Sequence, residues 1–216
     1  MYGWRVRSGG LECRLSQRKK HTLYGSRERG GFSTTRPGTT RVTKSGERSL
    51  IEVKITPELV ERAKKKTAHI GVLQGSITGS ASHVVGAIGE LIVADLTGAT
   101  EANTHDYDLI LDGKRIDVKT KRCNTPPKTY YDCSVAAHGS KQDCDSYVFV
   151  RIKIDGTRAW VLGEIDKRDF YKNATHHRRG DVDPDNGFVF KADCYNLAIS
   201  ELQDIETEST TVQARS

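Results

Sequence analysis

The sequence contains few cysteines and no long apolar run, and each absence argues against a class of protein. Its five cysteines are an odd number and include no Cys-x-x-Cys pair, which argues against a disulfide framework and fits a reducing compartment. No apolar run approaches the roughly 18 residues that a membrane-spanning helix needs. The N-terminus is basic but lacks the apolar stretch of a secretory signal. We therefore expect a cytoplasmic protein with no membrane partner.

Hydrophobic residues are also scarce, at 36% of 216 residues, and the positive charge is concentrated in one segment. Residues 1–50 hold 12 Lys or Arg and 3 Asp or Glu, a net charge of +9, whereas the whole chain carries +6 and the rest therefore −3. The segment 1–48 is rich in Gly, Ser, Thr and Arg without periodicity, and we expect a flexible, disordered basic arm. Such an arm suits a polyanionic partner, although an unstructured tail without a fixed partner has the same composition.

The remaining sequence predicts one mixed α/β domain over residues 49–205 and a disordered tail over 206–216. SLIEVKI alternates like a short strand, and Thr56 and Pro57 then mark the N-cap and first residue of a helix. The lysines that follow in this helix, 64–66, are expected to form a solvated face. Other predicted elements are strands at 107–111, 114–121, 130–137, 146–154, 158–163 and 188–192, a short helix from Asp166, a loop over 176–187, and a short terminal element over 195–202.

The segment 82–99 predicts a buried helix with one acidic residue in its most apolar part. Glu90 is this residue, Gly98 is placed to end the helix, and small residues lie at helical distance from Glu90. The apolar positions that recur at helical spacing are Val84, Val85, Ile88, Leu91, Ile92 and Leu96. Glu90 is either a functional acid or a solvated one on a face of alanine and glycine.

The stretch DYDLILDGKRIDVKTKR, residues 106–122, predicts a β-hairpin because Asp112-Gly113 separates two alternating runs. With a two-residue turn, Leu109 faces Ile116 and Tyr107 faces Val118 on an apolar face. On the other face Asp108 lies opposite Asp117, and Asp106 lies opposite Lys119. A three-residue turn would break this pairing.

Two opposed carboxylates, Asp108 and Asp117, repel each other unless positive charge compensates them. Lys119 supplies one positive charge, and a divalent cation would supply two. Hard oxygen ligands suit Mg²⁺ or Mn²⁺. An exposed hairpin whose repulsion is screened by water would satisfy the same pattern.

The order of these residues resembles that of the PD-(D/E)XK nuclease superfamily. GAIGE ends at Glu90 in a helix, YD ends at Asp108 in a strand, and IDVK follows over residues 116–119 in the next strand. The resemblance covers roughly residues 80–165, and the general character of the chain is similar to small phage-encoded members. Tyr107 replaces the proline that often precedes the first Asp. The exonuclease signature Gln-x-x-x-Tyr is not matched, because Gln142 and Tyr147 are one residue too far apart.

The resemblance implies a restriction-endonuclease-like fold, a mixed central sheet flanked by helices. It implies that Asp108 and Asp117 ligate Mg²⁺ or Mn²⁺, with the backbone carbonyl of Val118 as a further ligand. Glu90 would complete the ligand shell directly or through water. Lys119 would orient or help deprotonate the attacking water and stabilise charge on the phosphate.

The implied activity is metal-dependent hydrolysis of DNA, with an endonuclease preferred over an exonuclease, in the cytoplasm of a bacterial or phage-infected cell. Duplex-cutting endonucleases of this fold often act as dimers, so a homodimer is among the expected assemblies. Two rivals are a catalytically inactive nucleic-acid-binding protein of the same fold and an interaction protein whose acids lie far apart.

Three other basic residues are candidate contacts to DNA. Lys121 continues the face of Lys119, and Arg178 and Arg179 belong to a basic loop. Solvated surface roles fit these residues as well. A zinc site built from cysteines and a histidine is the weakest alternative, because its spacing matches no standard pattern; its members would be Cys123, Cys133, His138 and Cys144.

Overall fold

The structure is a computed structural model and describes residues 50–68, 80–102, 104–184 and 187–207. The predicted arm, residues 1–48, and most of the predicted tail lie outside these ranges. The described chain is a mixed α/β domain, as predicted. Its helices are α1 (Pro57–Thr67), α2 (Ser80–Thr97) and α3 (Lys167–Asn173), and its strands are β1 (Ile51–Lys54), β2 (Thr100–Glu101), β3 (Leu109–Leu111), β4 (Lys114–Cys123), β5 (Asp132–Ala136), β6 (Ser146–Lys153), β7 (Arg158–Asp166), β8 (Thr175–His177) and β9 (Cys194–Ala198).

The start of α1 and the end of α2 lie where the local sequence predicts them. Thr56 is the N-cap of α1, where its hydroxyl oxygen accepts a hydrogen bond from the Leu59 N–H at 3.3 Å, and Pro57 follows it. Gly98 ends α2 with φ of 72°, and its N–H donates to the carbonyl of Ala94 at 2.9 Å. None of the helices in the described part of the chain is long and apolar enough to cross a membrane.

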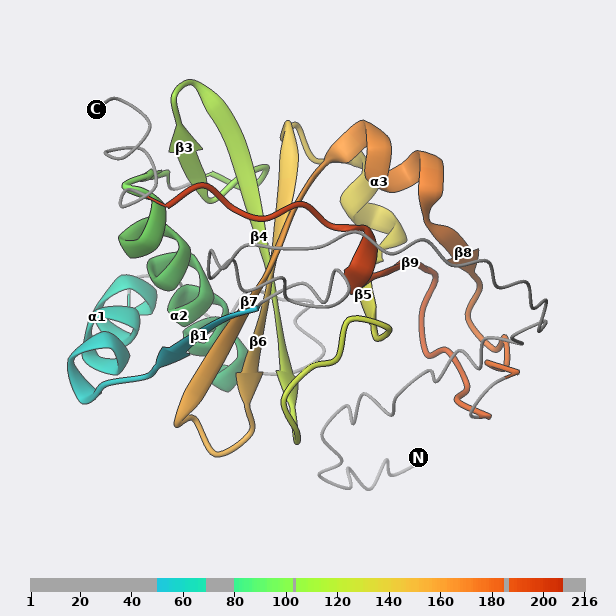
Figure 1. Cartoon of the computed structure of the whole chain (residues 1–216), viewed down its shortest axis with the longest axis horizontal. Helices are drawn as coiled ribbons and strands as arrows, with labels where there is room; N and C mark the ends of the chain where they lie inside the picture. The colour runs from blue at the N-terminus through green and yellow to red at the C-terminus, as the bar shows by residue number, and fades with distance from the viewer. Residues whose placement is uncertain (1–49, 69–79, 103, 185–186, 208–216) are drawn as a thin grey trace, which may run out of the picture.

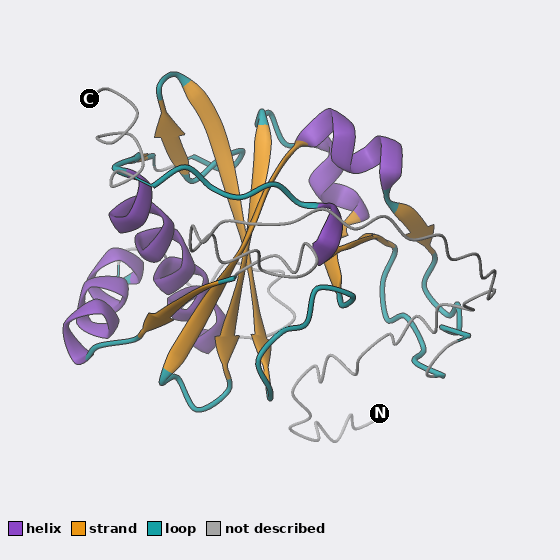
Figure 2. Ribbon diagram, in the orientation of Figure 1, coloured by secondary structure: helices purple, strands orange, loops and turns teal. Residues whose placement is uncertain are grey.

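Two sheets and the helices form layers, as Figures 1 and 2 show. The larger sheet has the strand order β1-β7-β6-β4-β3-β2, and the smaller sheet has the order β5-β9-β8. Most neighbours in the larger sheet are antiparallel, but β4 and β6 run parallel, with Asp117 beside Tyr147 and Lys121 beside Arg151. The helices α1 and α2 lie on one side of the larger sheet, and α3 and the smaller sheet lie on the other (Figure 1).

Each face of the larger sheet packs into its own hydrophobic core. On the helical side, Ile88 and Ile92 of α2 pack with Val118 of β4. On the other side, Phe149 of β6 and Leu197 of β9 are buried in the second core. The strands β4 and β6 are therefore enclosed from both sides, which fixes the side chains of β4 between the two cores.

Four predicted elements differ from the structure. The strand predicted from residue 107 begins only at Leu109. Residues 188–192 form no strand but a single bridge between Val189 and Val182. The last strand is β9, Cys194–Ala198, where we expected only a short terminal element, and it pairs with both β5 and β8. The first residues of the predicted basic loop, His176 and His177, belong to β8.

Candidate functional site

The hairpin turn has two residues, as predicted. Asp112 and Gly113 both have positive φ, 49° and 82°, which is the backbone of a type I′ turn. Leu111 pairs with Lys114, and Leu109 pairs with Ile116. The two-residue turn therefore sets the register of β4 relative to β3.

Followed outward from the turn, the regular pairing of β3 with β4 ends at Leu109. Asp108 therefore has no strand partner, and this part of the predicted pairing is wrong. The N–H of Asp108 donates to the carbonyl of Ile116 at 2.9 Å, and the N–H of Val118 donates to the Asp108 carboxylate at 2.7 Å. The Asp108 carboxylate thus accepts the hydrogen bond that a backbone carbonyl would accept in a regular strand pair. Tyr107 packs into the second core instead of facing Val118, which lies in the first core. Asp106 likewise has no strand partner in Lys119.

Asp117 and Lys119 form an ion pair on the face of β4 that the second core covers. Asp117 is 4% exposed, and its Oδ2 lies 2.5 Å from the Lys119 ammonium. Apart from this ion pair, Oδ2 has no hydrogen-bond donor among the described residues. Buried carboxylate oxygens are costly when they lack partners. Lys119 is thus the contact that compensates this buried oxygen, and a bound cation would share it with the lysine.

Asp108 is drawn toward the protonated state by its surroundings. Burial, then the negative charges of Glu90 and Asp117, raise the pKa of Asp108 to about 8, against the hydrogen bond from the Val118 N–H, which acts to lower it. Three carboxylates from α2, the segment before β3, and β4 therefore share one electrostatic environment. This convergence opposes the model of a merely charged hairpin, in which the acids lie far apart.

The close packing of α2 on β4 positions Glu90. A Cβ atom on Gly89 would lie 1.9 Å from the hydroxyl oxygen of Thr120, so only glycine permits this approach. Glu90 follows directly and its carboxylate lies over Gly86, one turn earlier, where a Cβ atom would be 3.8 Å from Oε1. The small residues around Glu90 thus let the helix carry an acid against the sheet.

Lys66 of α1 holds Glu90 from the other side, and sequence reasoning did not find this contact. Its ammonium lies 2.8 Å from Glu90 and 2.5 Å from Glu101. Burial acts to lower the pKa of Lys66, but its hydrogen bonds to the two carboxylates raise it overall. Lys64 and Lys65 are exposed, as predicted for that face, whereas Lys66 is half-buried and belongs to the site.

Gln142 and Tyr147 are further contacts of Lys119. The ammonium donates to Gln142 Oε1 at 2.9 Å and lies 5.6 Å from the centroid of the Tyr147 ring. Gln142 is itself fixed, since its Nε2 donates to the carbonyl of His105 at 3.3 Å. Their spacing does not match the exonuclease signature, and in the structure both residues help to position the lysine.

The other predicted basic residues lie in two different places. Lys121 is on β4, two residues after Lys119 and on the same face, with its ammonium 3.5 Å from the Ser134 hydroxyl. Arg178 and Arg179 are exposed in the loop after β8, an edge strand of the smaller sheet. Their backbone N–H groups donate to Asp181 and Asp193, so the structure does not bring them to the acidic site.

The donor set suits a hard cation, although the side chains are not preassembled as a closed ligand group. Within the described ranges, no group of three or more His, Cys, Asp or Glu is arranged to hold a metal ion. Asp117 nevertheless presents a buried carboxylate beside Asp108, and the repulsion among Asp108, Asp117 and Glu90 is what a cation would relieve. Cys133 of the zinc alternative packs in β5 within the second core.

Comparisons with known proteins assign no family to this geometry. A scan against protein-family models finds no match. A search of curated proteins finds no significant match. The functional interpretation therefore depends on the contacts and charges described above.

Proposed function

We propose that the protein is a metal-dependent deoxyribonuclease of the PD-(D/E)XK type with a restriction-endonuclease-like fold. The observation that carries the proposal is the hydrogen bond from the Val118 N–H to Asp108, which holds Asp108 beside Asp117 and next to Lys119. Glu90 adds a third negative charge from α2. Asp108 directly before β3, Asp117 and Lys119 on β4, and Glu90 on α2 are the residue types that this chemistry uses.

Asp108, Asp117 and the carbonyl of Val118 would hold Mg²⁺ or Mn²⁺. A strand residue directs its N–H and C=O to the same side, so the Val118 carbonyl points toward Asp108 as well. Glu90, which Lys66 holds, would act through water. The bound cation would supply an activated water and neutralise charge on the phosphate.

Lys119 would bind the scissile phosphate through its ammonium, which Gln142 and Asp117 hold in place. In the reaction a bond forms between a water oxygen and phosphorus, and the bond from phosphorus to one ester oxygen breaks. One proton of the water passes to solvent, and the leaving oxygen takes a proton. The second core beneath Asp117 keeps both side chains from rotating freely.

The test is cleavage of plasmid and linear DNA with Mg²⁺, Mn²⁺ or EDTA. We expect cleavage with either metal and none with EDTA, and a loss of about 100-fold or more in Asp117→Asn and in Lys119→Met. Asp169→Asn and Lys172→Met are matched controls because they change the same charges on exposed positions of α3. Equal cleavage by all five proteins would contradict the proposal.

The pairing of Lys66 with both Glu90 and Glu101 favours one second candidate, a nucleic-acid-binding protein of the same fold without catalysis. In that protein Lys66 would take the place of a cation beside the acids. Calorimetric titration with Mg²⁺ separates the two. A nuclease binds the metal in an Asp117-dependent manner, whereas the inactive protein binds DNA and no metal.

A further inference from the structure

A cavity of about 310 Å³ adjoins the candidate site along β4. It follows β4 from Val118 to Lys121 and is closed by Ser134 of β5 and Arg151 of β6. Gly86 of α2 also contributes, so the cavity reaches around the edge of β4 that β3 leaves unpaired among the described strands. Lys119 belongs both to the cavity and to the candidate site.

Two positively charged residues, Lys121 and Arg151, line this cavity, and no acidic residue is among its lining residues. Lys121 and Arg151 are direct neighbours in the parallel pairing of β4 and β6, on one face of the sheet and roughly 4.8 Å apart at the backbone. Among the described residues, neither forms an ion pair with an acid; their contacts are to the Ser134 hydroxyl and to the Asp132 carbonyl. Adjacent like charges are destabilising unless an anion compensates them.

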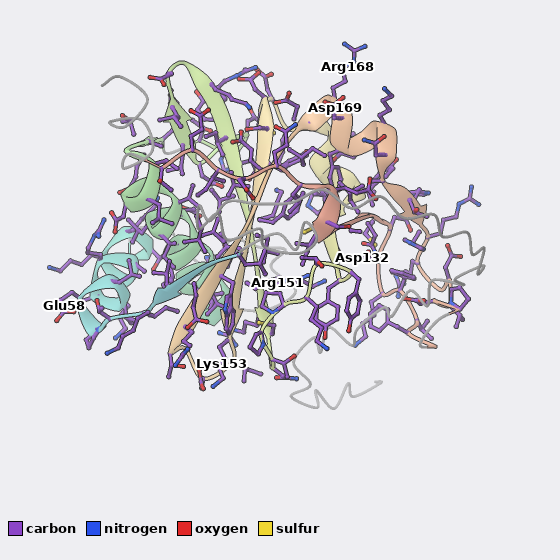
Figure 3. The ribbon with its side chains drawn as sticks, viewed as in Figure 1. Glu58, Asp132, Arg151, Lys153, Arg168 and Asp169 are labelled. Atoms are coloured by element: carbon purple, nitrogen blue, oxygen red, sulfur yellow. The ribbon has the colours of Figure 1, made fainter. Side chains whose placement is uncertain are left out.

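Arg151 supplies an unused donor. The residue is 5% exposed, and its Nη2 donates to the backbone carbonyl of Asp132 at 2.6 Å. Figure 3 shows these two residues close together. Nη1 is buried and has no hydrogen-bond partner within the part of the chain that is described. A buried guanidinium nitrogen without an acceptor is costly, and a phosphate oxygen is the acceptor that its geometry suits best.

We propose that this cavity binds one phosphate group of a nucleic-acid strand through Arg151, Lys121 and the Ser134 hydroxyl. The proposal rests on the proposed function, since it places this phosphate next to the one that Lys119 would hold. Lys119 and Lys121 are two residues apart on one strand face, roughly 6.6 Å, a separation comparable to that of neighbouring phosphates in a strand. The cavity therefore positions the strand for cleavage at the adjacent phosphate.

The phosphate has two possible sources, a phosphodiester inside the strand or a terminal phosphate. Both are negatively charged phosphate groups whose oxygens accept hydrogen bonds from charged donors. Fluorescence anisotropy in EDTA measures the affinity for short single-stranded oligonucleotides that carry either a 5′-hydroxyl or a 5′-phosphate. Comparing the two affinities distinguishes the two sources. Inorganic phosphate is added as a competitor at constant ionic strength, because simple screening by salt would otherwise imitate competition.

We expect Lys121→Met to weaken oligonucleotide binding by about tenfold and to remove the competition by inorganic phosphate. Lys172→Met, which removes one exposed positive charge from α3, should bind as the wild type does. A 5′-phosphate that strengthens wild-type binding, but not that of Lys121→Met, assigns the cavity to a terminal phosphate. Competition without any effect of the 5′-phosphate assigns it to an internal one.

Arg151→Lys keeps the charge but removes the planar donor pair, so it should bind more weakly than the wild type. Because Arg151 is buried, the result for this variant is used only if its thermal unfolding matches that of the wild type. If it does not match, the test depends on Lys121→Met, since Lys121 is only half-buried. Unchanged affinity and phosphate competition in Lys121→Met would overturn the proposal.

The two proposals fail separately. If the wild type cleaves DNA with metal and Lys121→Met binds oligonucleotides as the wild type does, the proposed nuclease function stands and the proposed phosphate cavity is overturned. Phosphate-sensitive binding that Lys121→Met loses, with no cleavage by the wild type under any metal, leaves the cavity and overturns the nuclease. Binding is measured in EDTA, so it does not require the metal-binding carboxylates.

Discussion

Asp108 is a residue whose protonation the fold alters strongly. Its carboxyl group has a pKa of about 8 instead of 3.8, so between these values the folded protein keeps a proton that the unfolded chain has lost. The stability that this group contributes is complete below about pH 4 and is lost as the pH rises through about 8. Neutralising metal charge would oppose that loss.

We expect the melting temperature of the metal-free protein to fall as the pH is raised from about 5.5 to about 8.5, and Asp108→Asn to reduce this dependence. Thermal unfolding in EDTA at several pH values measures it. The same series with Mg²⁺ should show a smaller fall in the wild type. Identical pH dependence in the wild type and Asp108→Asn would show that Asp108 does not hold the proton.

Residues near the site differ in how far the sequence predicts them. The alternation of Asp117 and Lys119 follows from strand periodicity, and their nearness is local. Lys66 lies 24 positions before Glu90, and nothing in either segment indicates that α1 and α2 pack against each other. Gln142 reaches Lys119 from the loop before β6, which only the parallel pairing of β4 and β6 brings near.

The contact between α2 and β4 depends on a missing side chain at Gly89. Gly89→Ala would place a methyl group against Thr120, and overpacking of this kind costs roughly 1–3 kcal/mol of unfolding free energy. Gly86→Ala is the matched control in the same helix. The nearest atom to its added Cβ is 3.8 Å away, so it should stabilise by roughly 0.5–1 kcal/mol.

Chemical denaturation of both variants measures these changes, and Thr120→Ala combined with Gly89→Ala should recover much of the loss. Equal effects of the two single alanine substitutions would mean that α2 can shift away from β4 without cost. Since Glu90 follows Gly89, such a shift would also change its distance from Asp108.

At the scale of elements, local chemistry explains the predictions that held. Asp112-Gly113 specifies its turn, and Thr56-Pro57 and Gly98 specify helix ends, because each acts on the backbone beside it. The early end of β3 was not predictable from alternation, since the Asp108 carboxylate replaces a strand carbonyl. Residues 188–192, FVFKA, have the aromatic and β-branched composition of a strand, but β9 occupies the place beside β5.

At the scale of the whole molecule, the charge is divided between the N-terminal segment and the rest. Residues 1–50 carry +9 and the remainder −3. If this segment contacts DNA, its removal should weaken binding and lower the dependence of affinity on salt, because fewer counterions are released.

Anisotropy with duplex DNA over a range of salt concentrations compares the full chain with a chain that begins at Ser49. We expect a shallower slope of log affinity against log salt for the shorter chain. Its Mg²⁺-dependent cleavage at low salt should persist, because the candidate catalytic residues lie in the α/β domain. An unchanged slope would assign the DNA contacts to the domain itself.

The early end of β3 has a consequence for solubility. It leaves the second half of β4 without β3 as a neighbour on that side, and an edge that no described strand covers is a template for pairing with another chain. Lys119 and Lys121 point from this half of β4, and a second strand laid along it would have to strip water from both ammonium groups. The charges proposed to hold phosphates would therefore also discourage self-association while the edge stays open to a substrate.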